Sequence, residues 1–367
     1  MLRIPELNIT VEQLIIGYCK SVLSPWIQMP WGCFQASGSV SYVCTEAQDG
    51  VDVLVDLGSP YNREEVKNAI WKKLEANLKN GWAEKRLYVV LSHCHIDHIG
   101  NLDLVDDLKE FRGFKAVQII CGQDLKDELK ITDRIRIIQT PGHTDHDISV
   151  IIDVGKDRNI AIVGDLYDCQ EDREDKEIWE ASSSNPMLQA RTREWMEKEA
   201  QVGFIIPGHG PGFYISGEAK AVEHIYPEIP PISTCYPISS VPFSSTPKNE
   251  PEALRLNAGT DEDQFEVLIN CGREVKAMTD EEREKVNMVI VHGHYSNAYG
   301  LGLFPHAQIV LGRDLAAPGG VYTGDHIQED KFHISSTLEL AFEGGEMTIH
   351  SREGGSTTRA KICGSRK

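Results

Sequence analysis

The chain has 367 residues, and its 56 acidic and 37 basic side chains give a net charge of −19 at pH 7. Its apolar fraction of 41% and charged fraction of 25% are those of a globular protein and exclude global disorder. The length favours two domains over one. The negative charge argues against electrostatic binding of nucleic acid over the whole surface.

Nine cysteines are scattered along the chain without a pairing pattern, which predicts reduced thiols. The N-terminus lacks a basic patch followed by an apolar core, so we expect no signal peptide. We find no apolar run that approaches the length of a membrane span. These features predict a soluble protein of the cytoplasm, with the nucleus also open.

The first 80 residues predict strands followed by one helix. Alternating segments at 39–44 and 51–56 read as strands separated by a turn. The second strand ends at Asp56 beside a glycine turn, where a carboxylate can orient a ligand-binding side chain. Residues 62–80 predict an amphipathic helix whose apolar stripe packs on the core.

The apolar run 87–91 predicts a buried strand, and the loop after it concentrates metal-ligand side chains: His93, His95, Asp97 and His98. The first two histidines are two residues apart on extended backbone, so they point the same way. The other two side chains fall where the chain bends and can aim at a second point nearby. Imidazole with carboxylate suits zinc, and the close spacing suits two ions.

Three later turns repeat this arrangement of a strand followed by a histidine or an aspartate. The strand at 134–138 leads to His143, the strand at 160–163 to Asp165, and the strand at 202–206 to His209. A helix at 185–200 precedes the last strand. If these were unrelated turn residues, four such turns in sequence would be a rare coincidence, so we expect one shared site.

These motifs identify the chain as a member of the metallo-β-lactamase superfamily over roughly residues 10–225. The H-x-H-x-D-H loop at 93–98, the Gly164-Asp165 turn and the segment Pro207-Gly208-His209-Gly210 carry the resemblance. It implies an α/β fold, an αββα sandwich of two sheets with helices outside. It also implies two zinc ions, both in the first domain. The implied ligands are His93, His95 and His143 for one ion, Asp97, His98 and His209 for the other, and Asp165 bridging both.

The resemblance implies a hydrolase that uses a hydroxide bridging two zinc ions, with Asp97 and Asp165 as its catalytic carboxylates. Asp56 is expected behind the ligands, where it holds an imidazole in the correct tautomer. Cys94 is expected to point away from its histidine neighbours and to pack.

The substrate is open at this stage. Similarity to an RNA-cleaving branch of the family implies an endoribonuclease acting on histone pre-mRNA 3′ ends. The ligand set is also similar to that of glyoxalase II, so a small thioester is an alternative substrate. A third hypothesis is that the protein binds metal as a scaffold and does not catalyse a reaction. An RNA substrate would need a local basic surface, for which the sequence offers two clusters: Lys72, Lys73 and Lys79 in one, Arg191 and Arg193 in the other.

The second half of the chain resembles the first. We expect a catalytic domain at 1–226, a proline- and serine-rich linker at 227–251, and an incomplete second copy at 252–367. Asn270 then stands where the first half has Asp56. His292 and His294 are retained, but Ser296 and Asn297 replace the next two candidate ligands. Such a copy should hold no binuclear centre and would serve packing or contact in a homo-oligomer.

Overall fold

The computed structural model describes most of the chain, in these ranges: 1–22, 33–47, 50–126, 128–155, 159–180, 182–215, 254–258, 265–291, 295–311, 321–322, 337–342, 345–350 and 359–364. The expected linker at 227–251 and the histidines at 292 and 294 lie outside these residues. The chain divides into two compact units. The first unit comprises 1–19, 36–99 and 104–226, and the second comprises 20–35, 100–103 and 227–367.

The first unit begins with a six-stranded sheet. Its order is β1-β2-β5-β6-β7-β8. The strands are β1 (Leu2–Ile4), β2 (Ile9–Ile15), β5 (Val40–Thr45), β6 (Val51–Val55), β7 (Lys85–Leu91) and β8 (Phe114–Cys121). The pairs β6–β7 and β7–β8 are parallel and the others antiparallel, so β6, β7 and β8 all end at the same edge.

A second six-stranded sheet completes the first unit, in the order β14-β13-β12-β11-β10-β9. Its strands are β9 (Leu129–Lys130), β10 (Ile135–Gln139), β11 (Ile148–Ile152), β12 (Asn159–Ile162), β13 (Val202–Ile206) and β14 (Phe213–Tyr214). The pair β12–β13 is parallel, and the other pairs are antiparallel. The neighbours β11 and β12 thus form an antiparallel pair.

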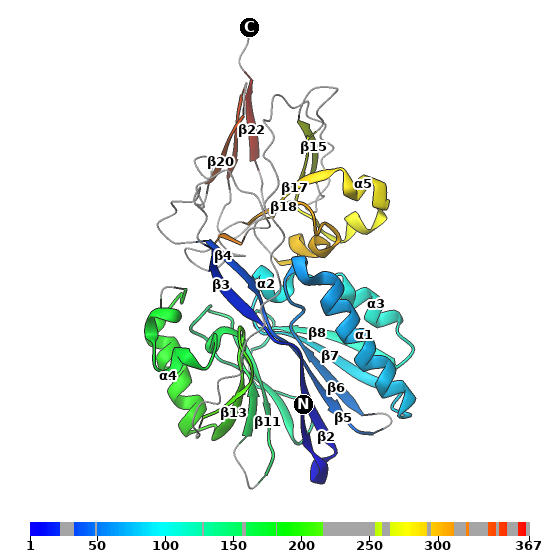
Figure 1. Ribbon diagram of the computed structural model, residues 1–367, viewed down its shortest axis with the longest axis vertical. Coiled ribbons are helices and arrows are strands. Elements are labelled where there is room, and N and C mark those ends of the chain that lie inside the picture. Colours follow the sequence, from blue (N-terminus) through cyan, green and yellow to red (C-terminus); the bar gives the residue numbers. More distant parts are fainter. Residues whose placement is uncertain are drawn as a thin grey trace. The chain divides into compact units, whose positions relative to one another are not determined.

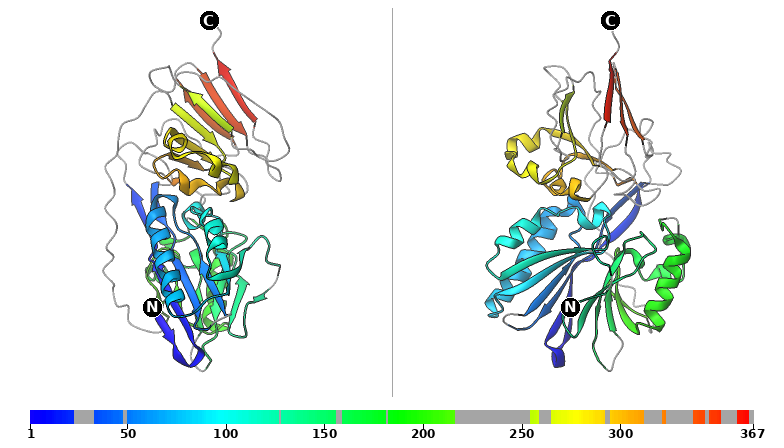
Figure 2. Two further views of the ribbon diagram at one scale, coloured as in Figure 1. Left: turned by 90° about the vertical axis from the view of Figure 1, so that its right-hand side faces the viewer. Right: turned by 180° about the vertical axis from the view of Figure 1, so that it is seen from behind.

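The two sheets lie face to face with helices outside, as expected for an αββα sandwich (Figures 1 and 2). Isoleucines and valines from both sheets, such as Val53 and Val90 opposite Ile137 and Val150, share one buried core. Each fully buried aliphatic side chain contributes about 1.5–3 kcal/mol to stability. On the outer faces, α1 and α3 cover the first sheet and α4 covers the second.

The helices follow the capping and stripe patterns of the sequence. They are α1 (Arg63–Lys79), α2 (Ile96–Ile99), α3 (Leu104–Glu110) and α4 (Pro186–Lys198), with 3-10 turns at Pro5–Leu7, Pro60–Asn62, Gly164–Leu166, Glu171–Arg173 and Lys176–Ile178. The expected stripe of α1 is buried at Val66, Ile70 and Leu74. The Asn185 side chain accepts a hydrogen bond from Leu188 N and caps α4.

The second unit contains a four-stranded sheet in the order β15-β16-β17-β18. Its elements are β15 (Leu254–Ala258), β16 (Phe265–Ile269), α5 (Asp280–Glu284), β17 (Val286–Val291) and β18 (Gln308–Leu311), with 3-10 turns at Arg273–Ala277, Tyr295–Ala298 and Leu301–Leu303. The strand pairs are antiparallel, parallel and parallel, the same sequence of directions as in β5-β6-β7-β8.

The strand ends also correspond. Asn270 follows β16 with φ +60°, and Asp56 follows β6 with φ +60°. The Asn270 N–H donates to Ile290 O at 2.7 Å, and the Asp56 N–H donates to Val90 O at 2.9 Å. Two non-glycine residues thus hold the left-handed conformation at matching positions, one in each unit.

The remaining strands form two small sheets. One has the order β19-β4-β3, from β3 (Tyr18–Val22), β4 (Cys33–Ser37) and β19 (Val321–Tyr322), and the other has the order β20-β21-β22, from β20 (Thr337–Phe342), β21 (Gly345–His350) and β22 (Arg359–Gly364). Among the helices in the described ranges, none combines the length and apolar character needed to cross a bilayer.

Candidate metal centre

Seven side chains expected to bind metal come together at one edge of the first unit. They form two groups whose ligand atoms lie within 4.8 Å of one another: His93, His95, His143 and Asp165 in one, and Asp97, His98 and His209 in the other. They come from the turns after β7, β10, β12 and β13. The stacking of the two sheets thus brings together strand ends that lie far apart in the sequence.

The first group is built around His95. Its Nδ1 atom lies 2.9 Å from Nε2 of His93 and 3.0 Å from Nε2 of His143. All three imidazoles are almost fully buried, with 1–4% of their surface exposed. Three ring nitrogens therefore face one point from which solvent is largely excluded.

Asp165 lies between the two groups. Its Oδ2 atom is 3.6 Å from Nε2 of His93 and 3.4 Å from Nε2 of His143, and its Oδ1 atom is 3.1 Å from Nε2 of His98. Oδ2 is also 3.2 Å from Nε2 of His209. The two oxygens of one carboxylate face histidines of both groups, which is the geometry required of a bridging ligand.

Several of these atoms make no hydrogen bond within the described residues. They are both carboxylate oxygens of Asp97, Nε2 of His98 and Oδ1 of Asp165, and all are buried. Burying polar atoms without partners is costly, and carboxylate and imidazole lone pairs that face one another repel. A divalent cation held by these atoms would remove both penalties, so the residues present fit a metal cofactor.

The protonation of the histidines also favours a bound metal cofactor. Burial lowers the pKa of His93 and His95 well below the ordinary value, and it lowers the pKa of His143 to about 4. Burial also acts to lower the pKa of His98, but the carboxylates of Asp165, Asp97 and Asp56 outweigh it and raise that pKa well above the ordinary value. The first group therefore offers neutral imidazoles, whereas the second lies in a negative field that attracts a cation.

Asp56 lies behind the ligands, at the position expected for it. Its Oδ2 atom is 2.8 Å from Nδ1 of His98 and accepts a 2.7 Å hydrogen bond from the Ser92 hydroxyl, while Oδ1 accepts from Ser92 N at 2.7 Å. With Nδ1 of His98 bonded to the carboxylate, Nε2 is the atom directed at the centre. Our sequence reasoning missed Ser92, although it directly precedes His93 and lies 3.1 Å from Nδ1 of that ring.

His209 is oriented by backbone groups. Its Nδ1 atom lies 3.1 Å from Tyr18 O and 3.2 Å from Ser37 O, so it donates to carbonyls and leaves Nε2 directed at the centre. The loop that carries it is held by a 2.7 Å bond from Ser39 N to Gly208 O. Gly208 has no room for a side chain, because a Cβ atom there would overlap Oδ1 of Asp165.

The turn that carries His143 satisfies its own polar groups. Asp147 accepts hydrogen bonds from the backbone N–H of Thr144, at 2.7 Å, and from the Thr144 hydroxyl. The backbone of the next segment contributes a 2.9 Å bond from Ser184 N to His143 O. Asp147 therefore satisfies polar groups of this turn and belongs to neither ligand group. Cys94 belongs to neither ligand group, and burial raises the pKa of its thiol to about 12, which favours the neutral form.

The expectation that Arg193 belongs to an exposed basic cluster is wrong. Arg193 is only 7% exposed and pairs with Asp172 at 2.9 Å, so it cannot belong to an exposed basic cluster. The helical spacing could have shown this, because Gln189, Thr192, Arg193 and Met196 form the buried face of α4.

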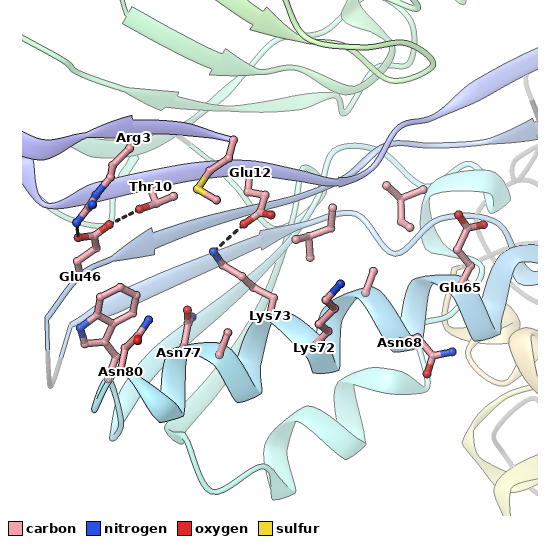
Figure 3. Close-up of a pocket in the computed structure, with 16 residues that line it drawn as sticks. Arg3, Thr10, Glu12, Glu46, Glu65, Asn68, Lys72, Lys73, Asn77 and Asn80 are labelled. Carbon is pink, nitrogen blue, oxygen red and sulfur yellow. Dashed lines mark hydrogen bonds and ion pairs between the residues drawn. The ribbon is translucent and has the colours of Figure 1, made fainter. Parts of the chain in front are cut away.

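A groove of about 910 Å³ lies along α1 and β2, and no candidate metal ligand lines it (Figure 3). Its charged side chains include the pair of Lys73 with Glu12, at 2.7 Å, and the pair of Arg3 with Glu46, at 2.7 Å. Lys73, from the other expected basic cluster, is therefore already neutralised. Lys72 also lines the groove and is exposed.

No family model matches the sequence. Curated relatives do match. The chain is 29% identical over 229 residues to metallo-beta-lactamase domain-containing protein 1 of Xenopus laevis, covering 58% of this chain and 84% of the relative. It is 30% identical over 191 residues to the protein of the same name from Rattus norvegicus, covering 50% of this chain and 71% of the relative.

Solved structures with a similar arrangement include a quorum-quenching N-acyl homoserine lactone lactonase, at 18% identity and a TM-score of 0.34 over 55% of this chain and 91% of that one. Another is AidC, a dizinc quorum-quenching lactonase, at 14% identity and a TM-score of 0.35 over 54% of this chain and 82% of that one.

Fold and site together define a metal-binding protein of the hydrolase class, built on an αββα sandwich. The chain belongs to the metallo-β-lactamase family. Among its relatives is the metallo-beta-lactamase domain-containing protein 1 of several vertebrates.

Proposed function

We propose that this protein is a binuclear zinc hydrolase whose substrate is single-stranded RNA. The observation that carries the hydrolase part is the convergence of seven buried ligand side chains in two adjacent groups. His93, His95 and His143 would hold one ion, and Asp97, His98 and His209 the other. Asp165 would bridge them, since its two oxygens face histidines of both groups.

When bound, two such ions lower the pKa of a water molecule and stabilise the negative charge that develops in hydrolysis. The chain's own residues then orient the reaction. Asp97 is 1% exposed, and neither of its carboxylate oxygens makes a hydrogen bond in the described part of the chain. One of its oxygens would bind the second ion, and the other would lie close enough to orient the attacking water and take its proton. Asp165 is the other carboxylate of the centre close enough to orient the water.

A surface beside the His143 turn supports an RNA substrate. A groove of about 370 Å³ is lined by Arg136, Arg191, Trp195 and Pro141, the last lying two residues before His143. Trp195 is 41% exposed, so part of its ring is accessible to a ligand. Arg191 is exposed four residues before it on α4 and forms no ion pair among the described residues. An aromatic face beside an unpaired guanidinium suits a stacked base and its phosphate.

The test compares RNA with a glutathione thioester, using purified protein of measured metal content. We expect cleavage of single-stranded RNA that is lost after chelation and restored by Zn²⁺, with about two zinc ions per chain. Asp97→Ala should abolish cleavage, which controls for contaminating nuclease. Trp195→Ala and Arg191→Met should weaken RNA binding while leaving the metal content unchanged.

Each part of the proposal can fail separately. If the purified protein binds no metal, the hydrolase proposal is wrong, and an inactive scaffold protein is the remaining interpretation. If the thioester is turned over while RNA cleavage persists in the Asp97→Ala protein, the substrate is a thioester and the RNA proposal is wrong.

We also propose that the second unit is a partial copy of the first that has lost its metal site. The matching strand directions and the left-handed residues Asp56 and Asn270 support this. In the first unit Leu57 N donates to His98 O at 2.7 Å, and in the second Cys271 N donates to Asn297 O at 2.7 Å. The backbone hydrogen bond is thus the same in both units, although the first unit has the candidate ligand His98 at this position and the second has the amide Asn297. Such a copy is free to serve contact with a second chain.

A further inference from the structure

Arg193, on the buried face of α4, occupies an environment built for a cation. Its guanidinium lies between two aromatic rings, 4.4 Å from the centre of Tyr167 and 4.1 Å from that of Trp179. The NH2 group is 2.9 Å from Oδ2 of Asp172 and the NH1 group 3.3 Å from Oδ1. The charge is therefore paired in a bidentate manner and stacked on both faces.

The same side chain holds the turn that carries Asp165. Nε of Arg193 donates to Leu166 O at 2.5 Å. One helical turn earlier, Nε2 of Gln189 donates to Asp165 O at 2.9 Å and to Leu166 O at 3.3 Å. Gly164, which precedes Asp165, has φ +52°, a conformation that glycine adopts without strain. The two side chains of α4 thus fix the carbonyls of the turn, in addition to backbone bonds such as that from Val163 N to Ile206 O at 3.1 Å.

The ion pair also reaches the loop of His209. Asp172 Oδ2, paired with Arg193, accepts a 2.7 Å hydrogen bond from Asp168 N. The carbonyl of Asp168 in turn accepts a 2.7 Å bond from His209 N. One buried guanidinium thus connects, through short bonds, to the backbone of two candidate ligands that lie 44 residues apart.

We propose that Arg193 is a positioning residue for the metal centre, fixing Asp165 and His209 at the spacing that two ions require. This rests on the proposed function. The three histidines of the first group come from the turns after β7 and β10 and make no contact with Arg193 in this chain of bonds. Asp165 belongs to the first group as well, but the three histidines of that group remain when Arg193 is lost. Loss of Arg193 should therefore weaken mainly the binding of the ion that depends on Asp97, His98 and His209, because that ion relies on both displaced residues, and the other ion should stay bound.

The experiment uses the full-length protein and measures metal per chain after dialysis, with Co²⁺ titration followed by visible absorption. Wild type should bind two ions. Arg193→Met should retain one and bind the second about 10- to 100-fold more weakly, the usual effect of losing a group that orients a ligand. Arg193→Lys keeps the charge without the planar fork and should recover part of the affinity. Lys198→Met, at an exposed ion pair with Glu194 on the same helix, should match wild type in metal binding.

A double variant separates the effect of Arg193 on the position of the ligands from its effect on the stability of the fold. Removing one partner of a buried ion pair can destabilise the whole fold, whereas replacing both with apolar residues often does not. Arg193→Met/Asp172→Leu should therefore melt near the wild-type temperature in the metal-free state and still bind the second ion weakly. If this folded variant and Arg193→Met bind both ions with wild-type affinity, Arg193 is a packing residue and the inference is wrong. Wild type without metal would refute both this inference and the proposed function.

Discussion

Asp56 and His98 are 42 residues apart in sequence, and Oδ2 of the carboxylate lies 2.8 Å from Nδ1 of the imidazole. The carboxylate is itself fixed by two hydrogen bonds from Ser92, and its backbone has φ +60°. A strained residue held by three polar contacts behind a candidate ligand indicates a role in orienting that ligand.

Asp56→Asn should lower zinc affinity by about tenfold or more. Asparagine tolerates the left-handed backbone, so the variant removes the charge without adding strain. Competition with a coloured chelator would measure the affinity. Asp153→Asn, at a half-exposed ion pair with Arg134, serves as the control and should bind zinc as wild type does. Equal affinities in all three proteins would exclude the proposed role of Asp56.

Gly208→Ala should displace Asp165 and cost the protein at least one metal ion, because the new methyl group overlaps Oδ1 of that carboxylate. Metal content by elemental analysis tests this. The comparison is Gly81→Ala, whose backbone has φ +80° but whose surroundings are open. It should lower stability by about 1 kcal/mol and leave the metal content unchanged. A Gly208→Ala protein that still binds two metal ions would show that Gly208 does not need to lie so close to Asp165.

Lys85→Met should destabilise the protein by about 3–5 kcal/mol, because it leaves the Asp52 carboxylate buried without its cation. The Lys85 and Asp52 side chains are each 1% exposed, and Nζ lies 2.8 Å from Oδ1. Urea denaturation of metal-free protein at pH 7 measures the change. Lys85→Met/Asp52→Asn should recover part of the loss. A single variant as stable as wild type would show that the buried pair contributes little.

A fragment ending at Tyr226 should fold and bind zinc. Both six-stranded sheets and all seven candidate ligands come from residues 2–214, so the fragment keeps the whole sandwich. Circular dichroism and metal analysis would show native-like melting and two ions. Insoluble fragment, or fragment without zinc, would mean that the first unit needs the C-terminal residues.

The sequence by itself determined the candidate ligand types of the first unit and the strands that lead to them, together with the two long helices. Turns and apolar runs are local patterns, and β7, β10, β12 and β13 lie within one or two residues of the predicted strands. Asp56, expected to hold an imidazole, lies against His98 for the same reason, because it ends the strand beside β7. The spacing of histidines and aspartates in the motifs predicted the candidate ligand residues.

Only the tertiary structure decided which groups face one another across long stretches of chain. Arg191 and Arg193 look alike in sequence, yet one is exposed and the other is buried against Asp172, 21 residues away. The carbonyls that orient His209 come from Tyr18 and Ser37, more than 170 residues earlier. Contacts of this kind depend on how two sheets and their outer helices stack, because packing, and not the neighbouring residues in sequence, sets which side chain meets which.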